Sequence, residues 1–354
     1  MPTGGTKGRI IEQSLHFKPN FNKLQITPRH HGHWYLPPVN PIIVLQSGVK
    51  MTAKIISGAE IALQIREEIK REVIRLKAEY NLVPGLATIL LGSDPGSLSY
   101  ITGKENAAKE LGFYSERIDL PETTSQKDLM ILVDKLNKDQ KIHGLLIQIP
   151  LPKHIDENEV LYAIDPKKDV DGFHPVNVGR LMIGDADYLP CTPAGIQQVL
   201  IRSGVNIDGA EVVVVGRSNI VGKPIANILM QKGKGANATV TICHTHTKDI
   251  ASHTRMADIL IVAAGRPKAV TADMIKEGAV VIDVGVNQIG TSSSGKRILV
   301  GDVDFENVKE KASMITPVPG GIGPMTITML MLNTLKAAKI AAGLSQPRGN
   351  KNEL

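Results

Sequence analysis

A tyrosine and a lysine stand four residues apart in a predicted helix, and a glutamine ends a nearby apolar strand. Tyr100 and Lys104 lie in the helix predicted over 98–111, so both side chains project from one face. Gln148 closes the strand predicted over 142–149, where a buried amide needs a partner. Lys104 and Gln148 both lie at carboxyl ends of strands in one predicted sheet, where open α/β sheets bind ligands. Lys104 can therefore be the hydrogen-bond partner of Gln148. The alternatives are a solvated Tyr–Lys pair and a glutamine satisfied by the backbone of its own loop.

A second candidate site follows the apolar strand predicted over 211–215. Gly216, a polar loop and Gly222 lead there to Pro224 at the start of a helix. Such a turn lets a phosphate approach backbone N–H groups at the positive end of the helix. The spacing departs from G-x-G-x-x-G, so a strand-to-helix turn that needs glycine for its geometry is the alternative.

The tip of the next predicted strand distinguishes NADP from NAD. An acid at this tip would bind the ribose 2′-hydroxyl of NAD, but the residues here are His244, Thr245 and His246. Arg217 in the preceding loop adds a positive charge that suits a 2′-phosphate, so the pattern favours NADP. The histidines and Cys243 are metal-ligand types, yet no paired C-x-x-C occurs and strand alternation separates Cys243 from His244. We therefore expect no metal site.

Two further segments are rich in glycine and proline. Asp169 and Asp171 lie in KDVDGFHP, which has no helical period, so they either form turns or line a cleft between two domains. The segment TPVPGGIGPMT, residues 316–326, directly precedes the last predicted helix. A loop of this composition is stiff yet lets a flat ligand approach its backbone closely.

Short apolar strands alternate with helices from Met51 onward, which predicts an α/β fold with parallel sheets built from right-handed βαβ units. The clearest helix is predicted to begin at Ser57, to bury an apolar face from Ile61 to Leu76 and to end near Asn81. A second series of strands begins after a helix that Thr192 is predicted to cap.

The predicted organisation has two domains. The last helix, predicted over 324–342, lies beyond the second series of strands and can pack back on the first domain, which makes the cofactor domain an insertion. The limits are an N-terminal extension over 1–50, a folate-binding catalytic domain over 51–193 and 317–345, a Rossmann-type NADP domain over 194–316, and a polar tail over 346–354.

Composition limits the partners that the chain can have. The net charge is +6, but residues 1–50 hold six Lys or Arg and one acid, so the remainder is near neutral and a nucleic-acid surface is unsupported. Two cysteines are too few for a disulfide framework, and no apolar run is long enough to cross a bilayer. We expect a cytoplasmic protein without membrane or nucleic-acid partners. If residues 1–50 are a leader, the alternative is an organelle matrix, although an over-extended start ahead of Met51 also explains them.

The order of these motifs resembles the bifunctional methylenetetrahydrofolate dehydrogenase/cyclohydrolase family of the bacterial type. The motifs run Y-x-x-x-K, L-I-Q-I-P-L-P, K-D-V-D-G-F-H-P, P-C-T-P, V-V-G-R-S-x-x-V-G-K-P and P-V-P-G-G-I-G-P-M-T, and the match covers about 57–342. The resemblance implies oxidation of 5,10-methylenetetrahydrofolate with NADP, then hydrolysis of the methenyl product to 10-formyltetrahydrofolate. It also implies a homodimer that assembles through the cofactor domain.

The same resemblance assigns roles to individual residues. Lys104 is implied as the catalytic lysine, Gln148 as the residue that tunes it, and Tyr100 as the neighbour that packs on the folate. Asp171 is implied to hold the pterin ring. The folate would be bordered by Pro317, Gly320 and Gly321, the NADP phosphates would be held by Gly216, Arg217, Ser218 and Thr245, and the nicotinamide would lie near Gly265 and Val286.

Two rival functions share the second domain. One is another two-domain NADP dehydrogenase, such as one acting on a shikimate-like acid, but it would not carry Tyr100, Gln148 and Asp171 in this order. The other is a non-catalytic NADP-binding sensor, against which Lys104 argues, because a general acid or base has no use in a sensor.

Overall fold

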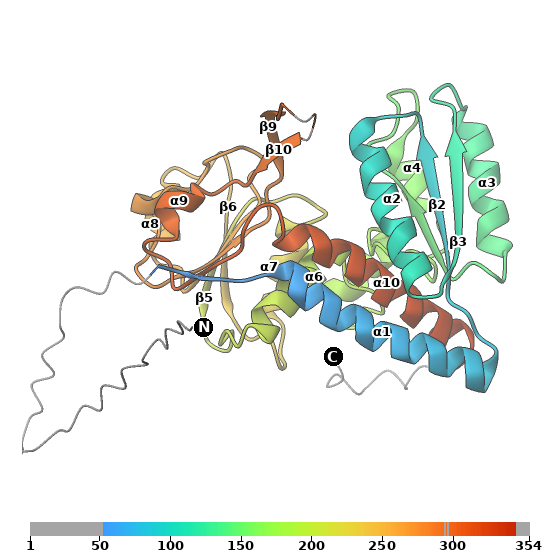
Figure 1. The fold of residues 1–354 in the computed structure, drawn as a ribbon, viewed down its shortest axis with the longest axis horizontal. Coiled ribbons are helices and arrows are strands. Elements are labelled where there is room, and N and C mark those ends of the chain that lie inside the picture. The colour runs from blue at the N-terminus through green and yellow to red at the C-terminus, as the bar shows by residue number, and fades with distance from the viewer. Residues whose placement is uncertain (1–51, 294, 296, 345–354) are drawn as a thin grey trace, which may run out of the picture. The chain divides into compact units, whose positions relative to one another are not determined.

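The computed structural model describes residues 52–293, 295 and 297–344, so the extension predicted over 1–50 and the tail predicted over 346–354 lie outside the described residues (Figure 1). Ten α-helices are found in the described part of the chain. Their bounds are α1 Gly58–Tyr80, α2 Pro95–Glu110, α3 Gln126–Lys138, α4 Glu157–Tyr162, α5 Pro175–Met182, α6 Cys191–Arg202, α7 Gly222–Met230, α8 Ile250–Thr254, α9 Phe305–Val308 and α10 Ile322–Ala341.

Two parallel sheets form the framework, which confirms the predicted α/β class. The first has the strand order β3-β2-β4, and the second has the order β1-β11-β8-β7-β5-β6, while β9 and β10 make a separate antiparallel hairpin. The strands are β1 Lys54–Ile55, β2 Gly85–Leu91, β3 Tyr114–Leu120, β4 Gly144–Ile147, β5 Glu211–Val215, β6 Thr239–Cys243, β7 Ile259–Val262, β8 Val280–Asp283, β9 Asn287–Thr291, β10 Arg297–Val300 and β11 Met314–Ile315.

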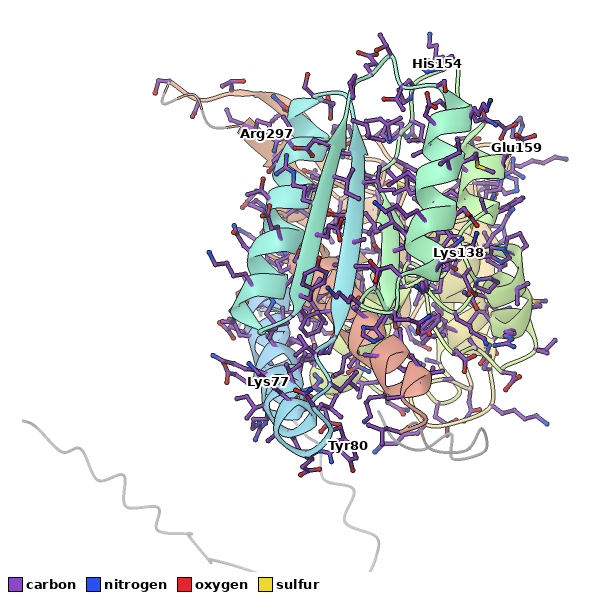
Figure 2. All side chains as sticks on the ribbon, turned by 90° about the vertical axis from the view of Figure 1, so that its right-hand side faces the viewer. Lys77, Tyr80, Lys138, His154, Glu159 and Arg297 are labelled. Carbon is purple, nitrogen blue, oxygen red and sulfur yellow. The ribbon has the colours of Figure 1, made fainter. Side chains whose placement is uncertain are left out.

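Helix α1 has the local structure that its sequence predicts. The Ser57 side chain accepts a hydrogen bond from Glu60 N, Asn81 adopts the left-handed conformation at the other end, and the buried face runs from Ile61 to Leu76. In Figure 2 the end of this helix carries Lys77 and Tyr80. Capping and periodicity are local properties, which is why the sequence alone predicts this helix correctly.

Two helix starts differ from the prediction. Helix α2 begins at Pro95 and not near Leu98, because Asp94 caps it by accepting a hydrogen bond from Ser97 N at 2.8 Å. Helix α6 begins at Cys191 after Pro190, so Thr192 lies inside the first turn and does not cap it. The Thr192 hydroxyl instead lies 2.9 Å from Thr326 Oγ1 of α10, a partner distant in sequence.

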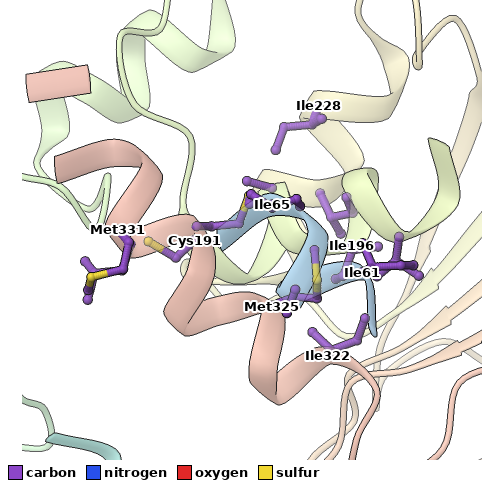
Figure 3. Packing of buried hydrophobic residues seen from close by; sticks show 14 of the residues in the cluster. Ile61, Ile65, Cys191, Ile196, Ile228, Ile322, Met325 and Met331 are labelled. Carbon is purple, nitrogen blue, oxygen red and sulfur yellow. The ribbon is translucent and has the colours of Figure 1, made fainter. Parts of the chain in front are cut away.

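The last helix packs back as expected. Helix α10 contacts α1, α6 and α2 (Figure 1), and Arg66 Nε donates to Thr328 Oγ1 at 3.1 Å. Ile61 and Ile65 of α1 meet Cys191 and Ile196 of α6 and Ile322, Met325 and Met331 of α10 in one buried cluster (Figure 3). The same cluster includes buried residues of both parallel sheets, so one core joins the elements on which the two sheets rest.

Two-residue strands at the edge of the second sheet could not be predicted. Lys54 of β1 pairs with Met314 of β11, and Met314 in turn pairs with Val280 of β8. Strand β1 therefore belongs to the larger sheet, while α1, which follows it, packs with α10. The exact limits of the two domains remain a prediction. No helix in the described ranges is long and apolar enough to span a membrane.

Candidate active site

Lys104 and Gln148 meet at the carboxyl ends of the strands of the smaller sheet. Lys104 Nζ of α2 donates to Gln148 Oε1 at 3.0 Å, directly after β4. The Gln148 amide donates in turn to Ile149 O at 2.8 Å, and its backbone N–H donates to Ile89 O. With its amide hydrogens directed at Ile149, the glutamine presents its oxygen to the lysine. The fold thus provides both partners that the sequence suggested for Gln148: Lys104 for its oxygen and the backbone of its own loop for its NH₂ group.

Asp169 and Asp171 have different environments although one residue separates them. Asp169 is buried and accepts hydrogen bonds from Phe173 N, His174 N and the Asn177 amide, so it is the turn former of this loop. Asp171 is half-buried and lies 3.6 Å from Cys191 Sγ. Burial raises the pKa of Asp171, and the nearby positive charge of Lys104 opposes the rise. Lys104, Gln148 and Asp171 thus belong to one polar cluster.

A cavity of about 190 Å³ is lined by Tyr100, which lies four residues before Lys104 on α2. Gly321 also lines the cavity. A Cβ atom on Gly321 would lie 2.5 Å from Pro317 O, so the loop requires glycine at that position. Lys104, Gln148 and Asp171 are not in its wall. The predicted site residues that line it are Tyr100, Val286, Pro317, Gly320 and Gly321.

A second cavity, of about 270 Å³, opens at the carboxyl ends of β5, β6 and β7. Gly216 has φ +132°, and a Cβ atom there would lie 2.2 Å from Ala263 O. Gly222 opens α7, and Ser218 Oγ accepts hydrogen bonds from its N–H and from Val221 N. This tight turn at a helix start fits a bound phosphate. The predicted residues that line the cavity are Gly216, Arg217, Ser218 and Thr245.

Two further basic residues line this second cavity: His244, which lies at the strand tip that the sequence linked to NADP, and Arg266, which sequence reasoning missed. Arg217 lines the same cavity. Desolvation and the charge of Arg217 lower the pKa of His244, so the ring is neutral near pH 7 and the two arginines supply the positive charge. Arg266 follows β7 at the same sheet edge as Gly216. Its position shortly after a strand of this sheet is the sequence feature that could have identified it as a cofactor contact. Gly265, just before it, does not line the cavity.

Comparisons with known proteins agree with this geometry. The catalytic-domain model of the tetrahydrofolate dehydrogenase/cyclohydrolase family matches residues 56–171, and the NAD(P)-binding-domain model of that family matches residues 190–342. The bifunctional protein FolD of Syntrophus aciditrophicus is 68% identical over 294 residues, which are 83% of this chain and all of that protein. The FolD protein of Dehalococcoides mccartyi strain BAV1 is 63% identical over 83% of this chain and 99% of its own length.

Solved structures of relatives have the same fold. The methylenetetrahydrofolate dehydrogenase/cyclohydrolase of Campylobacter jejuni is 45% identical, with a TM-score of 0.76 over 81% of this chain and 99% of that one. The enzyme of Trypanosoma brucei, solved with NADP cofactor and inhibitor, is 40% identical, with a TM-score of 0.78 over 82% of this chain and 99% of that one. The chain therefore belongs to the tetrahydrofolate dehydrogenase/cyclohydrolase family.

Proposed function

We propose that both reactions of the family take place between the Lys104–Gln148 pair and the cavity that Tyr100 and Val286 line. The chain is an NADP-dependent methylenetetrahydrofolate dehydrogenase and methenyltetrahydrofolate cyclohydrolase, and neither the shikimate-type dehydrogenase nor the sensor has these family matches. The observation that carries the site assignment is the 3.0 Å contact between Lys104 Nζ and Gln148 Oε1, one helical turn from Tyr100.

The dehydrogenase step requires orientation more than acid–base chemistry. The methylene carbon between two folate nitrogens loses a hydride, and the resulting methenyl cation is stabilised by the lone pairs of those nitrogens. NADP, when bound, accepts that hydride. Tyr100 and the Pro317–Gly321 loop would hold the folate, and Asp171 would bind the pterin ring. Because burial raises the pKa of Asp171, its carboxyl group is more readily able to donate a hydrogen bond than an exposed aspartate.

The cyclohydrolase step requires a proton carrier. Water must lose a proton as its oxygen attacks the cationic methenyl carbon, and a ring nitrogen must gain one as the ring opens. Lys104 carries an amine one helical turn from Tyr100, which lines the cavity, and the Gln148 oxygen fixes the direction of that amine. Lys104 would take the proton from water and return it to the leaving nitrogen.

The second cavity suits the cofactor by its shape and its charge. The turn at Gly216 and Gly222 is so tight that a Cβ atom on either glycine would lie 2.2 Å from a backbone oxygen, and Arg217 and Thr245 in the cavity wall would contact the 2′-phosphate of NADP. Ser218 would bind a phosphate beside the α7 N-terminus. Ala263 and Ala264 line this cavity, and Gly265 comes directly after them in the chain. Val286 lines the other cavity. Gly265 and Val286 would therefore border the nicotinamide.

The experiment that tests the site is Lys104→Met. A methionine keeps the apolar stem but carries no proton, so we expect cyclohydrolase kcat to fall by roughly 10²–10⁴-fold and dehydrogenase kcat to fall much less. Lys104→Arg should also lose hydrolysis, because guanidinium holds its proton at any working pH. Lys109→Met changes an exposed lysine of the same helix and is the matched control. Wild-type hydrolysis by Lys104→Met would move the catalytic assignment to another residue.

We also propose that the enzyme acts as a homodimer in the cytoplasm. Both Cys191 and Cys243 are buried free thiols, which suits a reducing compartment. Strand β6 is at the edge of the larger sheet, and Ile242 on this strand is 39% exposed. An open strand edge with an exposed isoleucine supports pairing with a second copy through the cofactor domain. Light scattering of the purified chain would measure the mass in solution.

A further inference from the structure

Asp302 lies between the two cavities and binds donors from two loops. This residue follows β10 and is fully buried. Its Oδ2 atom accepts hydrogen bonds from Ala264 N at 2.6 Å and Gly265 N at 2.8 Å. Its Oδ1 atom accepts from the Asn287 amide at 2.8 Å. One carboxylate therefore holds the turn after β7, which borders the cofactor cavity, and the start of β9, next to Val286.

The backbone of Asp302 is hydrogen-bonded to the wall of the cavity that Tyr100 lines. Asp302 N and Val303 N donate to the carboxylate of Asp283, and Gly285 N donates to it as well. Asp283 and Gly285 line the cavity with Tyr100. The packing is close, since a Cβ atom on Gly285 would lie 2.1 Å from Asp302 Oδ1. Displacement of the Asp302 carboxylate would thus shift both walls.

We propose that Asp302 is a positioning residue for hydride transfer. It fixes Gly265 on the cofactor side and the segment through Val286 on the folate side in one relative position. This proposal rests on the proposed function, in which those two residues border the nicotinamide. Hydride transfer depends steeply on the distance between donor and acceptor carbons. Binding of the NADP phosphates by Gly216 and Arg217, and hydrolysis by Lys104, use residues that Asp302 does not contact.

The first test is Asp302→Asn, a change of nearly equal volume. Its amide can keep an oxygen toward Ala264 and Gly265, but its NH₂ group then faces the NH₂ group of Asn287. Asn287 can present its oxygen instead only by turning its amide, which loses the hydrogen bond to Val300 O. We expect dehydrogenase kcat to fall by about 10–100-fold, with a larger deuterium isotope effect from dideuterated methylene folate and little change in the KM for NADP. Cyclohydrolase, assayed with methenyl folate and no NADP, should keep its wild-type rate.

A partner exchange makes the test sharper. Asn287→Asp added to Asp302→Asn reverses donor and acceptor across the contact and restores the net charge, so dehydrogenase kcat should recover at least tenfold. Asp258→Asn is the matched control, because Asp258 also accepts a backbone N–H, from Glu211, but at the amino ends of the strands. We expect that variant to keep the wild-type kcat and isotope effect.

Several outcomes would overturn the positioning role. These are a wild-type dehydrogenase kcat in Asp302→Asn, a parallel loss of both activities, or no recovery on exchange. If Asp302→Asn does not fold, Asn287→Ala removes only one of the three donors, and an unchanged hydride-transfer rate in that variant would overturn the proposal equally. Failure of the Lys104 assignment would appear in cyclohydrolase instead, so the two proposals fail in different assays.

Discussion

At the scale of single residues, identical side chains have different chemistry because their environments differ. The Asp169 carboxylate accepts hydrogen bonds from three protein donors. Asp171 lies near the charge of Lys104, and burial raises its pKa. Lys104 donates its hydrogen bond to the neutral amide of Gln148, whose oxygen fixes the direction of the amine.

Arg217→Ala tests the cofactor cavity. Loss of a charge-assisted hydrogen bond costs about 1.5–3 kcal/mol, so we expect the KM for NADP to rise roughly tenfold to a hundredfold and the KM for folate to stay nearly unchanged. Steady-state kinetics with each substrate varied would measure both constants. Arg255→Ala, an exposed arginine of the same domain outside both cavities, is the control. An equal rise in both KM values would contradict the assignment.

Asp283 should give the stability of the enzyme a distinct pH dependence. Burial raises its pKa from 3.8 to about 6, despite three backbone hydrogen bonds that lower it. The folded state therefore binds more protons than the unfolded state between these values, so this contribution is fully present below pH 3.8 and lost as pH rises through about 6. The difference amounts to roughly 3 kcal/mol.

Asp283→Asn removes the titration and isolates this effect. We expect the free energy of unfolding of the wild type, minus that of the variant, to decline between pH 4 and pH 6.5 and to be flat above, as measured by urea unfolding along a pH series. Hydrogen bonds lost in the variant shift the whole curve without changing its slope. A difference that does not vary with pH would contradict the raised pKa.

At the scale of elements, α10 holds the loops of the smaller sheet in place. The Asn333 amide donates to Val170 O at 2.8 Å and to Leu189 O at 2.9 Å, and it also contacts Cys191. These bonds join the loop that carries Asp171 to the start of α6. The last helix thus supports two loops that lie more than 140 positions earlier in the chain, one of which carries Asp171.

Asn333→Ala should therefore weaken both stability and folate binding. It leaves two buried carbonyl groups without this donor, at a cost of about 2–4 kcal/mol in the free energy of unfolding. We also expect a higher KM for folate, since Asp171 follows Val170. Thr334→Val is the matched control, because the Thr334 hydroxyl donates only within α10, to Leu330 O. If both variants lose the same stability, the bonds to the loops are not the cause.

At the scale of the whole molecule, the residues that match the family models include most of the buried cluster that joins the two parallel sheets. The Syntrophus relative aligns over its entire length with 83% of this chain, and the family models begin at residue 56. The larger sheet also includes β1, and Ile56 just after it is buried, so the folded unit extends a few residues before α1.

Deletion of residues 1–50 tests the predicted extension. We expect kcat of both activities and the Tm to stay at wild-type values, because the match to the family's catalytic domain begins at residue 56. A chain that begins at Ser57 is the contrasting variant. It lacks β1 and the buried Ala53 and Ile56, so its Tm should fall by several degrees. A lower Tm already on removal of 1–50 would show that the segment packs on the enzyme.

Local patterns in the sequence determined much of this protein. The α1 cap and its buried face, the strand over 211–215, and Lys104 as one of two candidate partners of Gln148 followed from periodicity, capping and the rule that parallel strands end at one edge. The order of the motifs indicated the family. These features could be predicted because each depends on residues close in sequence or on a general property of parallel sheets.

The tertiary structure alone decided the rest. Strands β1 and β11 have two residues each, too few for any period, and they exist because their partners lie beside them. Thr192 bonds to α10 instead of capping α6, and Arg266 reaches the cofactor cavity, because helices and loops distant in sequence meet there. The carboxylate of Asp302 likewise binds Ala264 and Asn287 because segments distant in sequence meet there. A hydrogen bond across tens of residues leaves no periodic trace in the sequence, since only the packed fold brings its donor and acceptor together.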